Sequence, residues 1–113
     1  MTIRETALYL NAELVQNEFE DTELQGAYTS DLLSDVMANA PAGGALITIQ
    51  AHKNTVAVAT LASISVIIVC NSRPIPEDMI QAAAEEGIAI LRTKESQFVV
   101  SGKLYQRLFP SSN

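Results

Sequence analysis

The fold is decided by the stretch Val66-Ile67-Ile68-Val69-Cys70, which a polar loop separates from a helical pattern over residues 76–86 and a second apolar run over residues 88–92. The first four residues of this stretch are all apolar, which is typical of a strand that is covered on both faces of a sheet. Pro76 at the beginning of the helical pattern and Gly87 directly after it are common start and stop signals of helices. Strand, helix and strand in this order predict two parallel strands joined by a crossover.

The same unit of strand, loop and helix occurs three times in the second part of the chain. Its strands are predicted over residues 45–50, 66–70 and 88–92, and its helices over 55–61, 76–86 and 96–108. Because parallel strands direct their carboxyl ends to one edge of the sheet, we expect the loops after these strands to lie together. Proteins of the α/β class usually bind their ligands at that edge.

Two more helices are predicted in the first part of the chain. Thr2 and Glu5 match a capping box, which opens a short helix at the start of the sequence. Ser30 or Asp31 can cap a second helix, since both side chains accept hydrogen bonds from backbone N–H groups.

Two strand-like segments, 12–16 and 24–29, flank an acidic, turn-forming stretch, and they could pair as a hairpin. With the three repeated units they complete an α/β fold of three layers, α/β/α, around a mainly parallel sheet of about five strands. A length of 113 residues suits one core, so we expect a single domain over residues 1–113.

Composition excludes several classes of partner. The net charge of −6 repels phosphate backbones and anionic lipid, so we expect neither nucleic acid nor membrane as a partner. The longest apolar runs are too short to cross a bilayer. The one cysteine cannot form an internal disulfide and the start of the sequence lacks an apolar signal, so we expect a cytoplasmic protein.

The familiar catalytic and metal-binding motifs are missing. No Gly-rich loop follows a strand, because the pair Gly43-Gly44 precedes one and is better explained as a turn. One histidine and one cysteine cannot supply a closed metal site. No nucleophile elbow accompanies His52. The sequence therefore predicts no cofactor, no metal and no enzymatic activity.

Cys70 carries the competing hypothesis. It ends a buried strand three residues before Arg73, as phosphate-carrying cysteines do at strand ends, so a phosphocarrier or small enzyme that uses Cys70 or His52 is the alternative. The loop is short for wrapping a phosphate, and free cysteines are mostly buried packing residues. A packing role for Cys70 is the favoured interpretation.

Polar side chains concentrate at the expected carboxyl edge of the sheet. Their convergence predicts a site for a small anionic ligand, formed by Asp31, His52, Asn54, Arg73 and Thr93. In this site His52 and Arg73 would meet the anion, and Asp31 would cap a helix or orient His52. The competing explanation is that loops are polar in any protein.

The helix over 55–61 is small and apolar on all sides, so it must be covered on more than one side. The cover is a neighbouring helix or a second copy of the chain. We predict a homo-oligomer, most simply a twofold dimer. A protein partner that binds this helix is the third hypothesis.

Several blocks of the sequence resemble free-standing DRTGG-domain proteins. They extend from about Thr2 to Tyr105 and include YTSDLLSDVMANA at 28–40, ITIQAH at 47–52 and NTVAVA at 54–59. The resemblance implies a fold like the amino-terminal domain of HPr kinase/phosphorylase and a regulatory or dimerising module, since the kinase chemistry of that enzyme belongs to a separate P-loop domain. His52-Lys53 and Cys70-Asn71-Ser72 stand where the family has its Asp-Arg and Thr-Gly-Gly, so only the fold and the segments around Asp31 and His52 carry over. We therefore predict a non-catalytic regulatory or binding module.

Overall fold

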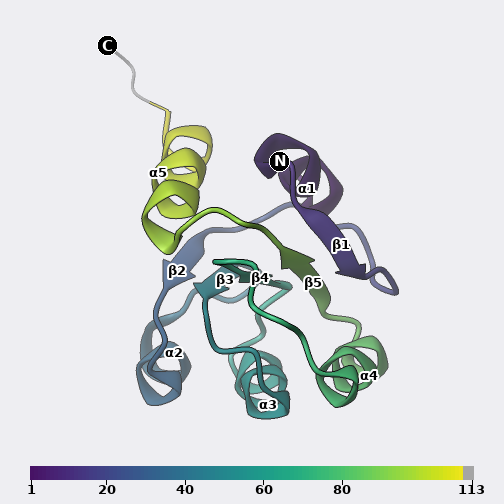
Figure 1. Cartoon of the computed structure of the whole chain (residues 1–113). Helices are drawn as coiled ribbons and strands as arrows, with labels where there is room; N and C mark the ends of the chain where they lie inside the picture. The colour runs from purple at the N-terminus through teal and green to yellow at the C-terminus, as the bar shows by residue number, and fades with distance from the viewer. Residues whose placement is uncertain (111–113) are drawn as a thin grey trace.

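The computed structural model describes residues 1–110 as alternating helices and strands around one sheet (Figure 1). In chain order the elements are α1 (Ile3–Leu10), β1 (Glu13–Gln16), β2 (Ala27–Thr29), α2 (Leu33–Asn39), β3 (Ala45–Thr48), α3 (Lys53–Leu61), β4 (Val66–Val69), α4 (Glu77–Glu86), β5 (Ala89–Arg92) and α5 (Gln97–Leu108).

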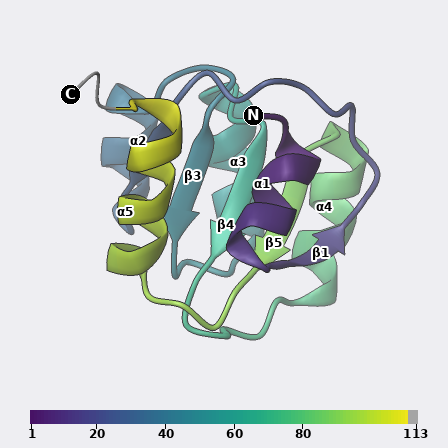
Figure 2. The ribbon, with the colours of Figure 1, turned by 90° about the horizontal axis from the view of Figure 1, so that it is seen from above.

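The sheet has five strands in the order β1-β5-β4-β3-β2. Strands β2, β3, β4 and β5 are parallel to their neighbours, and β1 joins β5 antiparallel at one edge. Helices α2, α3 and α4 cover one face of this sheet, and α1 and α5 cover the other (Figures 1 and 2). The predicted three-layer α/β fold with a mainly parallel sheet is confirmed.

The central strands are apolar throughout because both of their faces are covered. Leu46, Ile67 and Ile90 face the layer of α2, α3 and α4, whereas Ile47 and Ile68 face α1 and α5. All five side chains are at most 1% exposed.

The predicted hairpin of the first two strands is wrong, because β1 and β2 lie at opposite edges of the sheet. The acidic stretch between them does not turn back on itself. It passes the amino end of α1, where Ile3 N donates to Thr22 O at 3.2 Å and Leu24 N donates to Met1 O at 2.9 Å. These hydrogen bonds hold the connecting stretch against α1 while it crosses from one edge of the sheet to the other (Figure 2). As a result β1 pairs with β5, whereas β2 pairs with β3.

The helix ends follow the sequence signals in most places. The capping box of Thr2 and Glu5 is present on α1, Gly87 ends α4 in the left-handed conformation, and Ser96 accepts a hydrogen bond from Val99 N at the start of α5. Helix α2 differs, because its cap position is Leu32 and carries no side-chain cap.

Candidate ligand-binding site

The loops that follow β4 and β5 are bonded to each other at the carboxyl edge of the sheet. Asn71 N donates to Glu95 O at 3.0 Å, and Ser72 N donates to Thr93 O at 2.9 Å. Asn71 and Ser72 reach these partners with positive φ angles of 60° and 52°. The two loops therefore form one rigid wall beside the end of β5.

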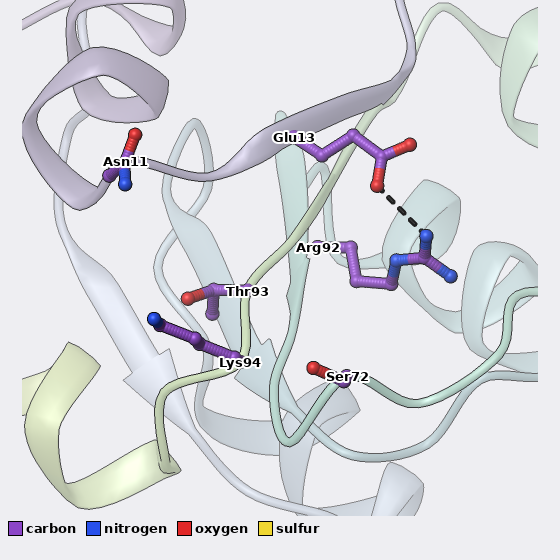
Figure 3. A pocket seen from close by; sticks show the side chains of 6 residues that line it. All are labelled: Asn11, Glu13, Ser72, Arg92, Thr93 and Lys94. Atoms are coloured by element: carbon purple, nitrogen blue, oxygen red, sulfur yellow. Dashed lines mark hydrogen bonds and ion pairs between the residues drawn. The ribbon is translucent and has the colours of Figure 1, made fainter.

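A cavity of about 460 Å³ opens at this wall (Figure 3). Its volume lies within the usual range for small-molecule sites, about 300–1,000 Å³. Side chains from α1's end, from β1 and β5, and from the two bonded loops line it: Asn11, Glu13, Ser72, Arg92, Thr93 and Lys94.

The lining is rich in hydrogen-bond donors and positive charge. Arg92 Nη2 donates to Glu13 Oε1 at 2.9 Å, an ion pair across the register position where β1 meets β5. Four of the five guanidinium N–H groups remain for other acceptors. The ion pairs between residues 1 and 110 are this one and Met1–Glu23, so the exposed Lys94 ammonium is unpaired. Hydroxyls and two cations converging on one cavity are suited to a small anion.

The five residues of the predicted site all lie at this carboxyl edge, and they follow four strands: Asp31 follows β2, His52 and Asn54 follow β3, Arg73 follows β4 and Thr93 follows β5. Of them, Thr93 lines the cavity and is 5% exposed. Arg73 directly follows the lining residue Ser72 and is exposed. His52 and Asn54 are exposed at the start of α3, outside the cavity lining.

Asp31 does not cap α2 as predicted, because its carboxylate is bound elsewhere. Asp31 Oδ1 accepts hydrogen bonds from Thr48 Oγ1 at 2.8 Å and from Ile49 N at 2.9 Å. Gln97 Nε2, at the start of α5, donates to the same oxygen at 3.1 Å. Asp31 therefore holds the loops after β2 and β3 to α5, and the cap position of α2 falls on Leu32 instead.

Cys70 is buried at the end of β4 with 0% exposure. Burial, and to a lesser extent the negative charge of Asp31, raises the pKa of the Cys70 thiol to about 11. The thiol is therefore protonated at neutral pH and poorly nucleophilic, as expected of a packing cysteine.

Five lining residues were not in the predicted site: Asn11, Glu13, Ser72, Arg92 and Lys94. Glu13 and Arg92 face each other only because β1 pairs with β5, whereas a hairpin would have placed β1 beside β2. The available signal was the positive charge at the end of the strand over 88–92, followed by Lys94 in the next loop.

The apolar helix over 55–61 corresponds to α3, and neighbouring helices cover one side of it. Val56 and Ala59 are buried in the cluster that includes Val36 of α2 and Met79 of α4. Leu61, at the end of α3, remains 71% exposed. Packing within one chain therefore explains one side of α3, while Ala57, Thr60 and Leu61 stay exposed.

Two further features are absent from residues 1–110. That range contains no helix with the length and apolar character needed to cross a bilayer. It also contains no group of three or more His, Cys, Asp or Glu side chains arranged to hold a metal ion.

The model of the family described as HPr Serine kinase N terminus matches residues 47–108. A curated relative, the HPr kinase/phosphorylase of Streptococcus uberis, is 53% identical over 38 residues. That match covers 34% of this chain and 12% of the relative, so most of the relative's length lies outside the match.

The fold is also similar to a solved structure. A crystal structure of the CBS and DRTGG domains of the regulatory region of Clostridium perfringens pyrophosphatase, complexed with its activator diadenosine tetraphosphate, has a TM-score of 0.73. The match has 15% sequence identity and covers 93% of this chain and 46% of that one. It shows that the two share the DRTGG-like fold.

Proposed function

This chain belongs to the HPr Serine kinase N terminus family, and we propose that it is a non-catalytic regulatory module that binds a small anionic ligand at the carboxyl edge of its sheet. The predicted family resemblance is confirmed, but the family match by itself names no ligand. The proposal therefore rests on the chemistry of the cavity.

The observation that carries the proposal is the cationic cavity in an acidic chain. The molecule has a net charge of −6, yet one cavity is lined by two cations, Arg92 and Lys94, against one carboxylate, Glu13, which is paired with Arg92. Arg73 follows the lining residue Ser72. Hydrogen bonds from charged donors are worth about 1.5–3 kcal/mol each. A phosphate or other small anion would find several such donors there, together with the hydroxyls of Ser72 and Thr93.

The relatives support regulation more than catalysis. The matched region of the Clostridium perfringens enzyme is a regulatory region, and its structure holds an activator that carries phosphate groups. The protonated, buried Cys70 argues against the alternative of a phosphocarrier that uses this thiol. Asp31, His52 and Asn54 lie at the same carboxyl edge but follow β2 and β3, outside the cavity lining. Their part in ligand binding stays a prediction, as does a cytoplasmic location.

The experiment is a thermal-shift titration of the full chain with inorganic pyrophosphate and with ATP. A ligand present at a hundred times its dissociation constant adds about 2.7 kcal/mol to the free energy of unfolding, which we expect for at least one of the two. Sodium chloride at the same ionic strength controls for general salt effects.

The matched variants are Lys94→Ala, in the cavity, and Lys103→Ala, which removes the same charge from α5 outside the lining residues. We expect Lys94→Ala to weaken binding about tenfold, the loss of roughly 1.4 kcal/mol, and Lys103→Ala to leave binding unchanged. Equal binding by both variants, or no stabilisation by either phosphate, would contradict the proposal.

A further inference from the structure

The edge of the sheet formed by β2 has no partner strand within residues 1–110 (Figure 1). Gly26 O accepts from Ala45 N at 3.0 Å and Ser30 N donates to Ile47 O at 3.2 Å, so these two residues face β3. Because backbone direction alternates along a strand, Ala27 and Thr29 direct their N–H and C=O groups outward. Two donors and two acceptors are therefore free at this edge.

The two edges of the sheet differ in their protection. Strand β1 carries the exposed charge of Glu13 and a bulge between Leu14 and Gln16, both of which discourage pairing with another chain. Strand β2 has the sequence Ala-Tyr-Thr, without charge, proline or bulge. Apart from its length of three residues, β2 has none of these protections, so the edge beside α5 is the less protected of the two.

Helix α5 presents an aromatic stripe on the side of this edge. Phe98, Tyr105 and Phe109 recur at helical spacing and are 88%, 67% and 59% exposed, and the last two rings lie 5.4 Å apart. Ser101 lies on the same side of the helix, and its Oγ atom is 2.6 Å from Thr29 Oγ1 of β2. The aromatic stripe therefore lies next to the free edge of β2. The opposite side of α5 faces α1, where Arg107 lies 4.5 Å from the ring of Tyr9.

The exposed aromatic area amounts to about half of one partner's share of a specific interface, so the strand edge and its surroundings must supply the rest. Taking about 200 Å² for each aromatic side chain, the three rings of the stripe expose roughly 400 Å². A standard interface buries about 800 Å² on each partner. A cavity of about 130 Å³ lies between β2 and the end of α5, lined by Thr29, Ser101, Tyr105 and Phe109 among others, and it can receive a partner side chain.

We propose that a second copy of the chain docks on this surface, with the β2 strands of the two copies paired antiparallel about a twofold axis at Tyr28. Ala27 of each copy then opposes Thr29 of the other, and these residues form four backbone hydrogen bonds. The two sheets become one continuous sheet of ten strands, and the aromatic stripes of the two α5 helices lie beside the junction. An identical partner fits because the same uncharged edge supplies both the donors and the acceptors.

The first test is the mass of the full chain by light scattering. We expect twice the chain mass of 12.2 kDa for the wild type, and 12.2 kDa for the double variant Phe98→Glu/Tyr105→Glu. Leu8→Glu is the matched control, because Leu8 is 82% exposed on α1, and it should stay dimeric. A wild type that is monomeric at millimolar concentration, or a dimer that survives the double variant, would overturn the proposal.

The second test places the axis. In the proposed pair the two Tyr28 Cα atoms are about 4.5 Å apart, a non-hydrogen-bonded pair that a disulfide can bridge. Tyr28→Cys should therefore form a covalent dimer under mild oxidation, whereas Leu8→Cys should not, and the native Cys70 is buried. The opposite result would be a dimer that Tyr28→Cys does not cross-link and that Leu61→Glu dissociates. That result would overturn the proposal and assign the interface to α3. Neither test depends on the anion cavity, which lies at the other edge of the sheet.

Discussion

Asp31 joins three segments of the chain through a single carboxylate oxygen. Its partners are a side chain at the end of β3, a backbone N–H in the loop after β3 and a side chain at the start of α5. Gln50 Nε2 also donates to the Asp31 backbone oxygen at 3.0 Å. The residue therefore acts as a structural connection at the edge where the ligand is proposed to bind.

We expect Asp31→Ala to destabilise the protein by about 2 kcal/mol, because the buried Thr48 hydroxyl and the Ile49 N–H lose their acceptor. Asp31→Asn keeps one acceptor oxygen and should lose about half as much. Urea unfolding of the three proteins measures both differences. If the alanine variant unfolds with the wild type, the network contributes nothing to stability.

The raised pKa of Cys70, about 11, predicts a dependence of stability on alkaline pH. The unfolded thiol ionises near pH 8.5 while the folded thiol stays protonated, so the unfolded state holds fewer protons between these values. Stability should therefore be complete below pH 8.5 and fall as the pH rises towards 11. Urea unfolding between pH 7 and 10 measures this loss, and Cys70→Ala should show a shallower decline. At pH 7 the native thiol should also react with a thiol reagent more than about a hundredfold more slowly than the unfolded one.

At the scale of elements, two glycines allow a matched comparison. Gly87 ends α4 with φ 67°, whereas Gly102 lies inside α5, and an added Cβ would meet no atom within 4 Å at either position. Gly87→Ala should cost about 1 kcal/mol because an L side chain disfavours that conformation. Gly102→Ala should stabilise by roughly 0.5–1 kcal/mol because alanine favours the helix. Urea unfolding at one protein concentration compares them, and shifts of the same sign would contradict the argument.

Local signals predicted the elements better than their neighbours in the sheet. The strands over 45–50, 66–70 and 88–92 were predictable because each is a short apolar run. The ends of the last two helices were marked by Pro76, Gly87 and Ser96. The positions of β1 and β2 were not, because they depend on hydrogen bonds between the start of α1 and the residues around Thr22. This error removed Glu13 and Asn11 from the predicted site, since a strand's partner decides which side chains it brings together.

At the scale of the whole molecule, the two edges of the sheet serve different proposed roles. The cavity lies where β1 meets β5, and the free strand edge lies at β2, with the buried strands β4 and β3 between them. Residues 94–96 form a short link in the chain between the two places, because they join the lining residue Lys94 to the start of α5, which lies beside β2. Whether ligand binding affects dimerisation therefore depends on how firmly that start is held.

Two contacts hold it without Lys94. Ser96 caps α5 through Val99 N, and Gln97 donates to Asp31 at 3.1 Å. We therefore expect pyrophosphate to bind the monomer and the dimer with dissociation constants that agree within about twofold. Calorimetry at protein concentrations above and below the one at which the dimer dissociates measures both. Linkage makes any coupling reciprocal, so this comparison also reports the effect of the ligand on dimerisation. Gln97→Ala, which frees the start of α5, is the variant in which coupling should emerge. A tenfold difference in the wild type, about 1.4 kcal/mol of coupling, would mean that binding at the cavity moves α5 and that one edge of the sheet controls the other.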